Sequence, residues 1–413
     1  MPMPGDTTVL ISGAGVAGPV LAYWLAHHGF APTVVERLTS IRRSGGHAVD
    51  LWGSAVDVVE RMGILPRIAA ARTGNTAASL IRPGKPPVHM QVGDLTTPLT
   101  ERSVEIPRDD LTWLLNDAAG PNAEYILGDS IAAIEEGPDG VTATFESGSR
   151  RRFDLVVGAD GLHSRVRRLA FGDESQFRRY LGGYIAICSV PDFLGLEGRI
   201  LNYRDVDRTV VMYPVRQTGD VRAVFMFRRA EEFDGDHRDM SRQKRLLRAA
   251  YATSGWEVPR LLDYVSRSDT LYFDSISQIR MDAYTRGRIA LVGDAGYAPG
   301  SGVGGGTSLA TTAAYILARE LAAADGDHRV AYERYARALR EVIPKTRAIG
   351  PALVASLIPR SRVELALGTQ VARAFPRLPR RLRQAIPLLP RPAAEGLRAM
   401  AALPLADEMP QKT

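Results

Sequence analysis

The sequence contains a single cysteine, Cys188, among its 413 residues. A lone cysteine cannot form a disulfide within the chain, which favours a reducing compartment. We interpret Cys188 as a small buried side chain on a strand and assign it no chemistry. No apolar run approaches the ~20 residues that span a bilayer, and no charged leader with an apolar signal core is present at the N-terminus. The sequence therefore predicts a cytoplasmic protein.

Histidine is also scarce, with seven residues. Neither the histidines nor the carboxylates show metal-ligand spacing, so no metal site is expected. No Ser/His/Asp arrangement is evident, and we predict no catalytic side chain. The net charge of +6 and a pI of about 9.5 come from scattered basic residues without a nucleic-acid-binding motif. A solvated face, or attraction of anionic ligands, is the better interpretation.

Glycine, in contrast, is abundant and gathered in particular places. The segment VLISGAGVAG combines an apolar strand with Gly13, Gly15 and Gly18 at the start of an Ala/Leu-rich helix. This is the G-x-G-x-x-G pattern in its strand–turn–helix context. Gly13 permits the turn, Gly15 lets the backbone approach a pyrophosphate at the helix N-terminus, and Gly18 allows close packing. Glu36 ends the next strand, where it can bind ribose hydroxyls and would repel a 2′-phosphate.

This unit predicts a dinucleotide site but does not distinguish FAD from NAD. The rest of the chain favours FAD, because the nucleotide-binding pattern is interrupted by a different pattern and then resumes. Alternating strands from about Tyr180 to Ile279 indicate a mostly antiparallel sheet with one polar helix, and RIALVGDAG resumes a buried strand. We expect a first FAD-binding part at 1–179, a substrate-binding sheet at 180–280, the FAD-binding return at 281–345 and a helical tail at 346–413.

The stretch LVGDAGYAPGSGVGGGTSLA holds the densest run of glycine. It lacks the lysine of a P-loop, and Pro299 stands where a G-x-S-x-G elbow needs its first glycine before Ser301. An extended FAD fits better. Asp294 would hold its ribityl or pyrophosphate region, and the N–H groups of residues 304–307 would face the pyrimidine end of the flavin.

With these motifs the chain resembles the single-component FAD-dependent aromatic hydroxylases typified by para-hydroxybenzoate hydroxylase, and most of all their tetracycline-inactivating branch. GAGVAG, ADGLHSRVR and the VGDA segment carry the resemblance, supported by SGGHAVDL and PRDDL, over about residues 7–340. It implies an α/β fold with a Rossmann-like FAD-binding domain, an inserted antiparallel sheet and a C-terminal helical segment. The cofactor residues implied by motif and resemblance are Gly13, Ala14, Gly15, Val16, Ala17, Gly18, Glu36, Arg37, Arg43, Gly46, Asp50, Arg108, Leu127, Asp160, Gly293, Asp294, Gly304, Gly305, Gly306 and Thr307.

The resemblance also implies the chemistry. NAD(P)H would reduce the flavin, O₂ would add at C4a, and the resulting hydroperoxide would transfer one oxygen atom to a small molecule. The choice between NADH and NADPH, between hydroxylation, epoxidation and Baeyer–Villiger oxidation, and between monomer and homodimer stays open. Gly296-Tyr297 and the position of Pro299 depart from the family pattern, and the departure concerns the substrate side more than FAD binding.

For the substrate, the alternating strands suggest an apolar, aromatic or polyketide-like ligand. The candidate lining residues are Met212, Tyr213, Phe225, Phe227 and Pro299, with Tyr184 and Tyr272 as further aromatic candidates. Tyr213 and Arg204 could orient a hydroxyl or carboxylate. Two alternatives remain: another FAD enzyme, such as a reductase of carbon–carbon double bonds, or a non-redox cyclase or binding protein that keeps FAD as a scaffold. A halogenase is disfavoured because its tryptophan motif is absent.

The tail alternates apolar segments with Arg/Pro breaks, so each helix is confined to a few turns. Such helices could lie on an anionic membrane. We favour the alternative in which they pack across both domains and close the substrate cavity.

Overall fold

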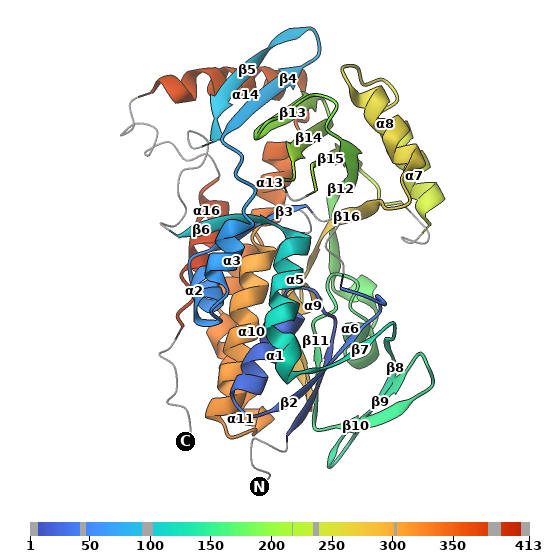
Figure 1. Ribbon diagram of the computed structural model, residues 1–413, viewed down its shortest axis with the longest axis vertical. Helices are drawn as coiled ribbons and strands as arrows, with labels where there is room; N and C mark the ends of the chain where they lie inside the picture. The colour runs from blue at the N-terminus through green and yellow to red at the C-terminus, as the bar shows by residue number, and fades with distance from the viewer. Residues whose placement is uncertain are drawn as a thin grey trace.

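A parallel sheet forms the lower half of the molecule in Figure 1. The computed structural model describes residues 7–41, 47–92, 102–216, 218–233, 239–300, 304–378 and 390–405. The sheet has the order β17-β18-β11-β1-β2-β7 and is parallel except for the β17–β18 edge pair. Its strands are β1 (Thr8–Ser12), β2 (Ala31–Glu36), β7 (Glu124–Leu127), β11 (Leu155–Gly158), β17 (Thr285–Arg286) and β18 (Ile289–Leu291).

Both faces of this sheet are covered, which is why its central strands are continuous apolar runs. On one face lie α1 (Ala17–His27), α5 (Arg108–Ala119), α10 (Gly306–Ala323) and α11 (His328–Leu339). The other face packs against α6 (Arg165–Ala170) and a three-stranded sheet of β8 (Ile131–Gly137), β9 (Gly140–Phe145) and β10 (Arg150–Phe153). Short 3-10 turns follow at η2 (Gly120–Asn122) and η3 (Glu174–Gln176).

A seven-stranded sheet forms the upper half, in the order β16-β12-β15-β14-β13-β4-β5. It is antiparallel except where β13 pairs with β4. Its strands are β4 (Ala77–Arg82), β5 (Lys85–Gln91), β12 (Arg178–Pro191), β13 (Arg199–Asp205), β14 (Arg208–Pro214), β15 (Asp220–Arg228) and β16 (Tyr272–Ile279). The hairpin β4–β5 lies in this sheet, so the first 179 residues do not all belong to the FAD-binding half.

Helices cover the two faces of the upper sheet. One face packs against α7 (Met240–Ala250) and α8 (Val258–Arg267); the sequence indicated a helix near α7 and missed α8. The opposite face packs against α13 (Ile349–Leu357), and α14 (Arg362–Ala374) lies across β5 and β13. The sheet therefore has two apolar faces.

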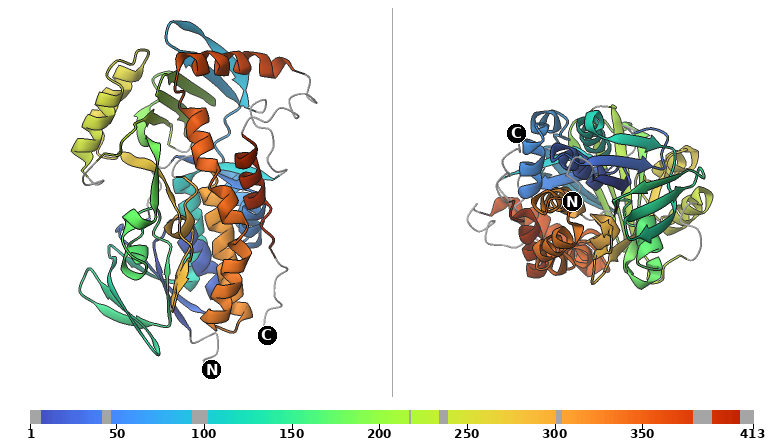
Figure 2. Two further views of the ribbon diagram at one scale, coloured as in Figure 1. Left: turned by 180° about the vertical axis from the view of Figure 1, so that it is seen from behind. Right: turned by 90° about the horizontal axis from the view of Figure 1, so that it is seen from below.

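The C-terminal helices reach both halves of the molecule (Figure 2). Whereas α13 and α14 pack on the upper sheet, α16 (Arg391–Ala401) packs on α12 (Val342–Thr346), α10 and α2 (Ser54–Arg61). The Ser54 hydroxyl donates to the carbonyl oxygens of Ala401 at 3.0 Å and Leu403 at 2.5 Å. In the described part of the chain, no helix combines the length and apolarity that a membrane crossing requires.

The remaining elements connect the halves. A two-stranded ribbon of β3 (Ala48–Trp52) and β6 (Ser103–Pro107) runs between them, and α3 (Leu65–Ala70) follows α2. The return from β18 passes through α9 (Asp294–Tyr297) into α10, and η4 (Phe375–Arg377) continues α14.

Candidate functional site

A cavity of about 2400 Å³ extends between the two halves. Typical small-ligand pockets measure roughly 300–1,000 Å³, so this cavity has room for a dinucleotide together with a second molecule. Its walls come from the β1–α1 turn, β3, the start of α5, the start of α10, strands β4, β13 and β16, and the tail helices α13 and α14. The sequence-predicted residues that the structure describes can therefore be placed relative to one space.

The first glycine turn forms one end of the cavity. Gly13 has φ +105°, and a Cβ there would lie 2.7 Å from the Ala159 carbonyl oxygen. A Cβ on Gly18 would lie 1.9 Å from the Gly13 carbonyl oxygen, so helix and turn pack in direct contact. Gly15 differs, because a Cβ on it would meet nothing within 4 Å. Its backbone faces the cavity, beside the N-terminus of α1, where an anionic group is stabilised.

Glu36 closes the side of this turn. Its two carboxylate oxygens accept hydrogen bonds from the Ala14 and Leu38 backbone N–H groups, each at 2.9 Å. The side chain lines the cavity together with Arg37. Leu127 pairs with Glu36 across β2 and β7 but is 41% exposed and does not line the cavity. Leu127 therefore lies outside the cavity wall, with its side chain exposed at the sheet edge, and its contact with the cofactor stays a prediction.

Asp160 holds the backbone at the carboxyl end of β11. Its carboxylate accepts from the Ser164 hydroxyl at 2.5 Å and from the N–H groups of Arg165 and Val166 at 2.8 and 3.1 Å. Burial raises the pKa of Asp160, and these hydrogen bonds oppose the rise. The adjacent Gly161, at φ +80°, presents bare backbone to the cavity with nothing within 4 Å of its Cβ position. Asp160 therefore shapes a cavity wall.

The second glycine turn lies opposite the first. Residues 304–307 line the cavity, and Gly305 caps α10 with φ +86°. Because α10 is 18 residues long, its N-terminal N–H groups carry a partial positive charge. A Cβ on Gly306 would lie 3.2 Å from Asp294 Oδ1, so the carboxylate sits against the turn. Burial raises the pKa of Asp294, and the positive charge of Arg108 opposes that rise.

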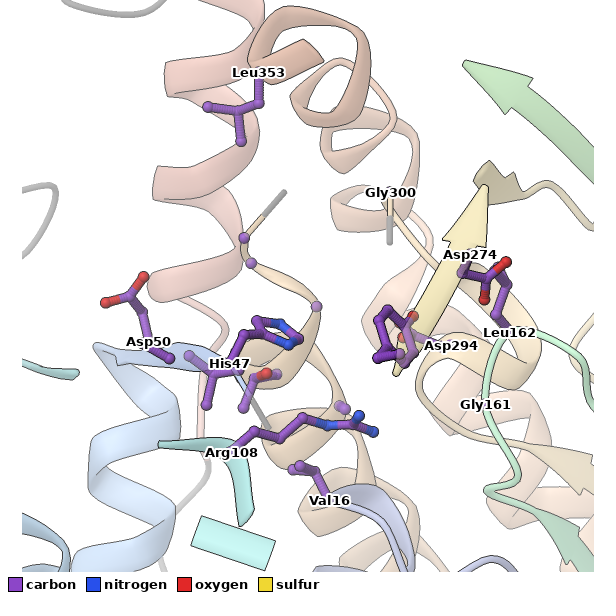
Figure 3. Close-up of a pocket in the computed structure, with 18 of the residues that line it drawn as sticks. Val16, His47, Asp50, Arg108, Gly161, Leu162, Asp274, Asp294, Gly300 and Leu353 are labelled. Carbon is purple, nitrogen blue, oxygen red and sulfur yellow. The ribbon is translucent and has the colours of Figure 1, made fainter. Parts of the chain in front are cut away.

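The β3–β6 ribbon brings polar side chains to the middle of the cavity. In Figure 3, His47 and Arg108 extend toward the segment that carries Asp294. The Arg108 N–H donates to the His47 carbonyl oxygen at 2.8 Å. Burial and the charge of Arg108 lower the pKa of His47 to about 3. Burial and the opposing carboxylate of Glu105 raise the pKa of Asp50 to about 7.

The ribbon is joined directly to the second glycine turn. The Ser308 hydroxyl donates to the Asp50 carbonyl oxygen at 2.9 Å and accepts from the Trp52 N–H at 3.0 Å. Asp50, Arg108 and the α10 N-terminus thereby face one space although they come from distant parts of the chain.

Most of the predicted cofactor residues within the described ranges line this cavity. These are Gly13, Ala14, Gly15, Val16, Ala17, Glu36, Arg37, Asp50, Arg108, Asp160, Asp294, Gly304, Gly305, Gly306 and Thr307. Gly18 and Gly293 do not line the cavity but pack behind the two turns. A Cβ on Gly293 would lie 3.1 Å from the Ala310 side chain. Arg43 and Gly46 lie outside the described residues.

The residues present fit an extended FAD. Gly15 and Gly161 leave backbone open where a Cβ would enter the cavity, two helix N-termini face it, and Glu36 offers carboxylate oxygens for a ribose. The described residues contain no group of three or more His, Cys, Asp or Glu arranged to hold a metal ion. The donor set therefore suits a long anionic dinucleotide.

The expected substrate residues divide between the two faces of the upper sheet. Met212, Phe225 and Phe227 are buried in the core against α7 and α8 and do not line the cavity, and Tyr184 belongs to the same core. This corrects their assignment, and the reason is the two-residue period of a strand. Tyr213, the neighbour of Met212, lies on the opposite face, where its hydroxyl accepts from the Ala48 N–H at 2.7 Å.

Two further candidates lie near the second glycine turn. Pro299 is not part of the cavity wall; its carbonyl oxygen accepts from the Gln278 amide at 2.6 Å. Tyr272, at the start of β16, does line the cavity. Of the proposed aromatic residues, Tyr272 is therefore the one that lines the cavity.

Sequence reasoning missed most of the substrate-side wall. It consists of residues of β4 and alternate residues of β13, with residues of α13 and α14 facing them; among them are Ala78, Leu80, Ile200, Asn202, Leu353 and Leu357. Sequence reasoning named Arg204 but identified neither β13 as a strand nor its pairing with β4. The amphipathic tail was the available signal for the opposite wall.

An ionic cluster joins the halves at the cavity wall. His163 follows β11, and its ring nitrogens lie 2.9 Å from Glu174 Oε1 and 3.1 Å from Asp274 Oδ2. Burial by itself would lower the pKa of His163, but hydrogen bonds and charge from Asp274 and Glu174 outweigh it and raise the pKa to about 9. Asp274 comes from β16 of the upper sheet, so a charged imidazolium ties the two halves together.

Comparison with known proteins agrees with this site. The family model described as "FAD binding domain" matches residues 6–338. An uncharacterized protein of Mycobacterium tuberculosis, Rv1260, is 43% identical over 79% of this chain and 88% of its own length. A flavin-dependent monooxygenase of Legionella longbeachae is 36% identical over 84% of this chain and 89% of its own length.

A solved structure extends the similarity to the tail. The crystal structure of tetracycline destructase Tet(55) has a TM-score of 0.80 and 32% identity, covering 98% of this chain and all of that one. The chain belongs to the class A FAD-dependent monooxygenases, close to their tetracycline-inactivating branch. It is accordingly an FAD-binding oxidoreductase, as the motifs predicted.

Proposed function

We propose that this protein is a monooxygenase that uses NAD(P)H and O₂ to oxygenate an apolar, aromatic or polyketide-like small molecule. One observation carries the proposal: the groove between the two glycine turns and the chamber between β13 and the tail helices are a single continuous cavity. A cofactor held by the turns and a ring system held in the chamber would share it. Reduced FAD supplies the activation of O₂ and the transfer of one oxygen atom.

The chain's own residues have three tasks in this function. The β1–α1 turn and Glu36 would hold the adenosine diphosphate part. The N-terminus of α10 faces the cavity with backbone N–H groups, which would stabilise negative charge on the reduced ring. Asp294 and Arg108 would hold the portion between them, with Asp50 beside the ring.

The tail helices would exclude bulk water from the substrate chamber. Leu353 and Leu357 of α13 line the chamber from one side, and Ile200 of β13 lines it from the other. A dry chamber protects a reactive oxygen species from release before transfer. We therefore assign α13 a role in coupling NAD(P)H consumption to oxygen transfer, in addition to its role in packing. The helix lies outside the matched FAD-binding domain, which ends at residue 338, yet forms part of the chamber wall.

The test is product analysis under ¹⁸O₂. The holoprotein is supplied with NADH or NADPH and a panel of hydroxylated naphthalenes and anthracenes, and products are analysed by mass spectrometry. One ¹⁸O atom per product, with one NAD(P)H consumed, supports the proposal. NAD(P)H consumption with a reduced product and no ¹⁸O would identify a reductase, and product formed with oxidised FAD alone would identify a non-redox function.

A further inference from the structure

The substrate chamber contains a cation on an otherwise largely apolar stretch of wall. Strand β13 alternates, so Tyr203 packs into the core on the far face while Ile200, Asn202 and Arg204 line the cavity. Its parallel neighbour β4 contributes Leu80, which is in register with Asn202. Arg204 therefore faces the same space as the leucines of α13.

The guanidinium of Arg204 has only weak neutral partners in the described part of the chain. Its Nε lies 3.3 Å from Asn202 Oδ1, and its Nη1 lies 3.4 Å from the Ser356 carbonyl oxygen. Glu364 also lines the cavity, but its Oε2 accepts from the Arg360 N–H at 2.7 Å. Among the described residues, no carboxylate forms an ion pair with Arg204.

Arg204 is not needed to hold α13 in place. The carbonyl oxygens at the end of α13 already accept shorter hydrogen bonds from other strands: Arg228 donates to Ile358 at 2.8 Å and to Val354 at 2.9 Å, and the Thr209 hydroxyl donates to Leu357 at 2.6 Å. The 3.4 Å contact of Arg204 adds little to these.

Electrostatics agree with the geometry. Burial lowers the pKa of Arg204, and no nearby charge opposes that effect. A guanidinium stays protonated in proteins nonetheless, so within the described residues the chamber holds a positive charge that no carboxylate pairs with, and its only hydrogen bonds are the two weak ones to Asn202 and Ser356. Such a group is costly unless an anion or strong acceptor binds to it.

We propose that Arg204, assisted by Asn202, binds an acidic oxygen of the substrate, either a carboxylate or an ionised enol or phenol, on an otherwise apolar ring system. The proposal depends on the proposed function in taking this chamber as the substrate site. The planar guanidinium donates to the anion in a bidentate manner. Asn202 contributes an amide on the same face, and the leucines of α13 contact the apolar body.

Binding measurements on the FAD-loaded protein test this without turnover. Three probes are compared: 1-hydroxy-2-naphthoate, its methyl ester, which lacks the carboxylate charge, and 1-naphthol, which keeps only the phenol. Affinity is measured from the change in the visible spectrum of bound FAD and by calorimetry. Wild-type protein is expected to bind the naphthoate at least about tenfold more tightly than the ester, as charge-assisted hydrogen bonds imply. If the phenol group is the recognised acid, 1-naphthol binding rises with pH through its ionisation instead.

Variants assign the preference to this residue. Arg204→Gln should remove the preference for the acidic probe while leaving ester affinity unchanged, and Arg204→Lys should restore part of it. Arg267→Gln is the matched control, because Arg267 is exposed at the end of α8 on the far face of the sheet. The proposal is overturned if wild-type protein binds neither acid or shows no preference, or if Arg204→Gln weakens all three probes equally. Failure to incorporate oxygen would refute the proposed function and leave this binding result standing.

Discussion

The two ends of the cavity are built in different ways. The cofactor end consists of backbone: two glycine turns and two helix N-termini, each encoded within about ten consecutive residues. The chamber end consists of side chains from β4, β13 and the consecutive helices α13 and α14, three regions that lie more than 100 residues apart in the chain. Backbone groups bind phosphate and ring edges whatever the substrate is, whereas side chains can be exchanged without disturbing the fold. The first end is therefore typical of the family, and the second can be specific to this protein.

The largest expected effect comes from filling the backbone opening. Gly15→Val should leave the fold intact, because the Cβ position meets no protein atom within 4 Å, but should weaken FAD affinity by about 10- to 100-fold through overlap with the cofactor. FAD content after gel filtration and the melting temperature of the FAD-free protein measure the two effects. Gly120→Val is the control, since Gly120 also faces open space but lies away from the cavity. Normal FAD content in Gly15→Val would contradict the placement of the cofactor.

A substitution at the chamber end should change the coupling of the reaction and leave FAD binding unchanged. Leu353→Ser introduces a polar group into the wall formed by α13 and should lower the ratio of product to NAD(P)H consumed by about threefold or more, because water enters the chamber. FAD content should stay unchanged. Val363→Ser on α14 is the control, as Val363 is 67% exposed. A fully coupled Leu353→Ser enzyme would show that α13 does not exclude water.

The ionic cluster between the ends should contribute to stability in a pH-dependent way. The folded-state pKa of His163, about 9, lies above the ordinary histidine value of 6.5. Its contribution is therefore complete below about pH 6.5 and is lost as the pH rises through 9. His163→Gln should lower the free energy of unfolding by roughly 2–3 kcal/mol at pH 6 and by much less at pH 10. Urea titrations measure this, with the exposed His27→Gln as control. An equal loss of unfolding free energy at both pH values would show that His163 is not charged in the folded protein.

The smallest expected effect comes from Asp50. Its folded-state pKa of about 7 lies above the ordinary aspartate value of 3.8. The cost of ionising the buried carboxylate is therefore absent below about pH 4, grows as the pH rises from 3.8 to 7, and is complete above pH 7. Asp50→Asn should stabilise the FAD-free protein by roughly 1–2 kcal/mol at pH 8, since the cavity leaves the carboxyl partly hydrated. At pH 5 the gain should be smaller. Asp139→Asn, at an exposed turn, should show neither effect; an equal gain at pH 5 would point to a cause other than charge.

The cofactor end could be predicted from the sequence better than the chamber end, because the former is encoded locally and the latter by distant segments. The turn at Gly13–Gly18, Glu36 and the residues around Asp294 could be recognised because a phosphate-binding turn requires particular residues at fixed spacing. Leu127 belongs to no such motif, and the exposure of its side chain at the edge of the parallel sheet could be seen only in the tertiary structure. Met212 and Tyr213 could be assigned to opposite faces from strand periodicity, but not to the face that lines the cavity.

The sequence by itself determined the cofactor class, the interruption of the FAD-binding half by an antiparallel sheet, and the helical tail, because these follow from local glycine patterns and hydrophobic periodicity. Only the tertiary structure decided that β4 and β5 join the second sheet, which face of that sheet lines the chamber, and that α13 and α14 complete it. Those choices depend on packing between segments distant in the chain, whose apolar faces are alike in sequence and are distinguished only by the partners they bury against. The position of Arg204 opposite α13 is one result of that packing.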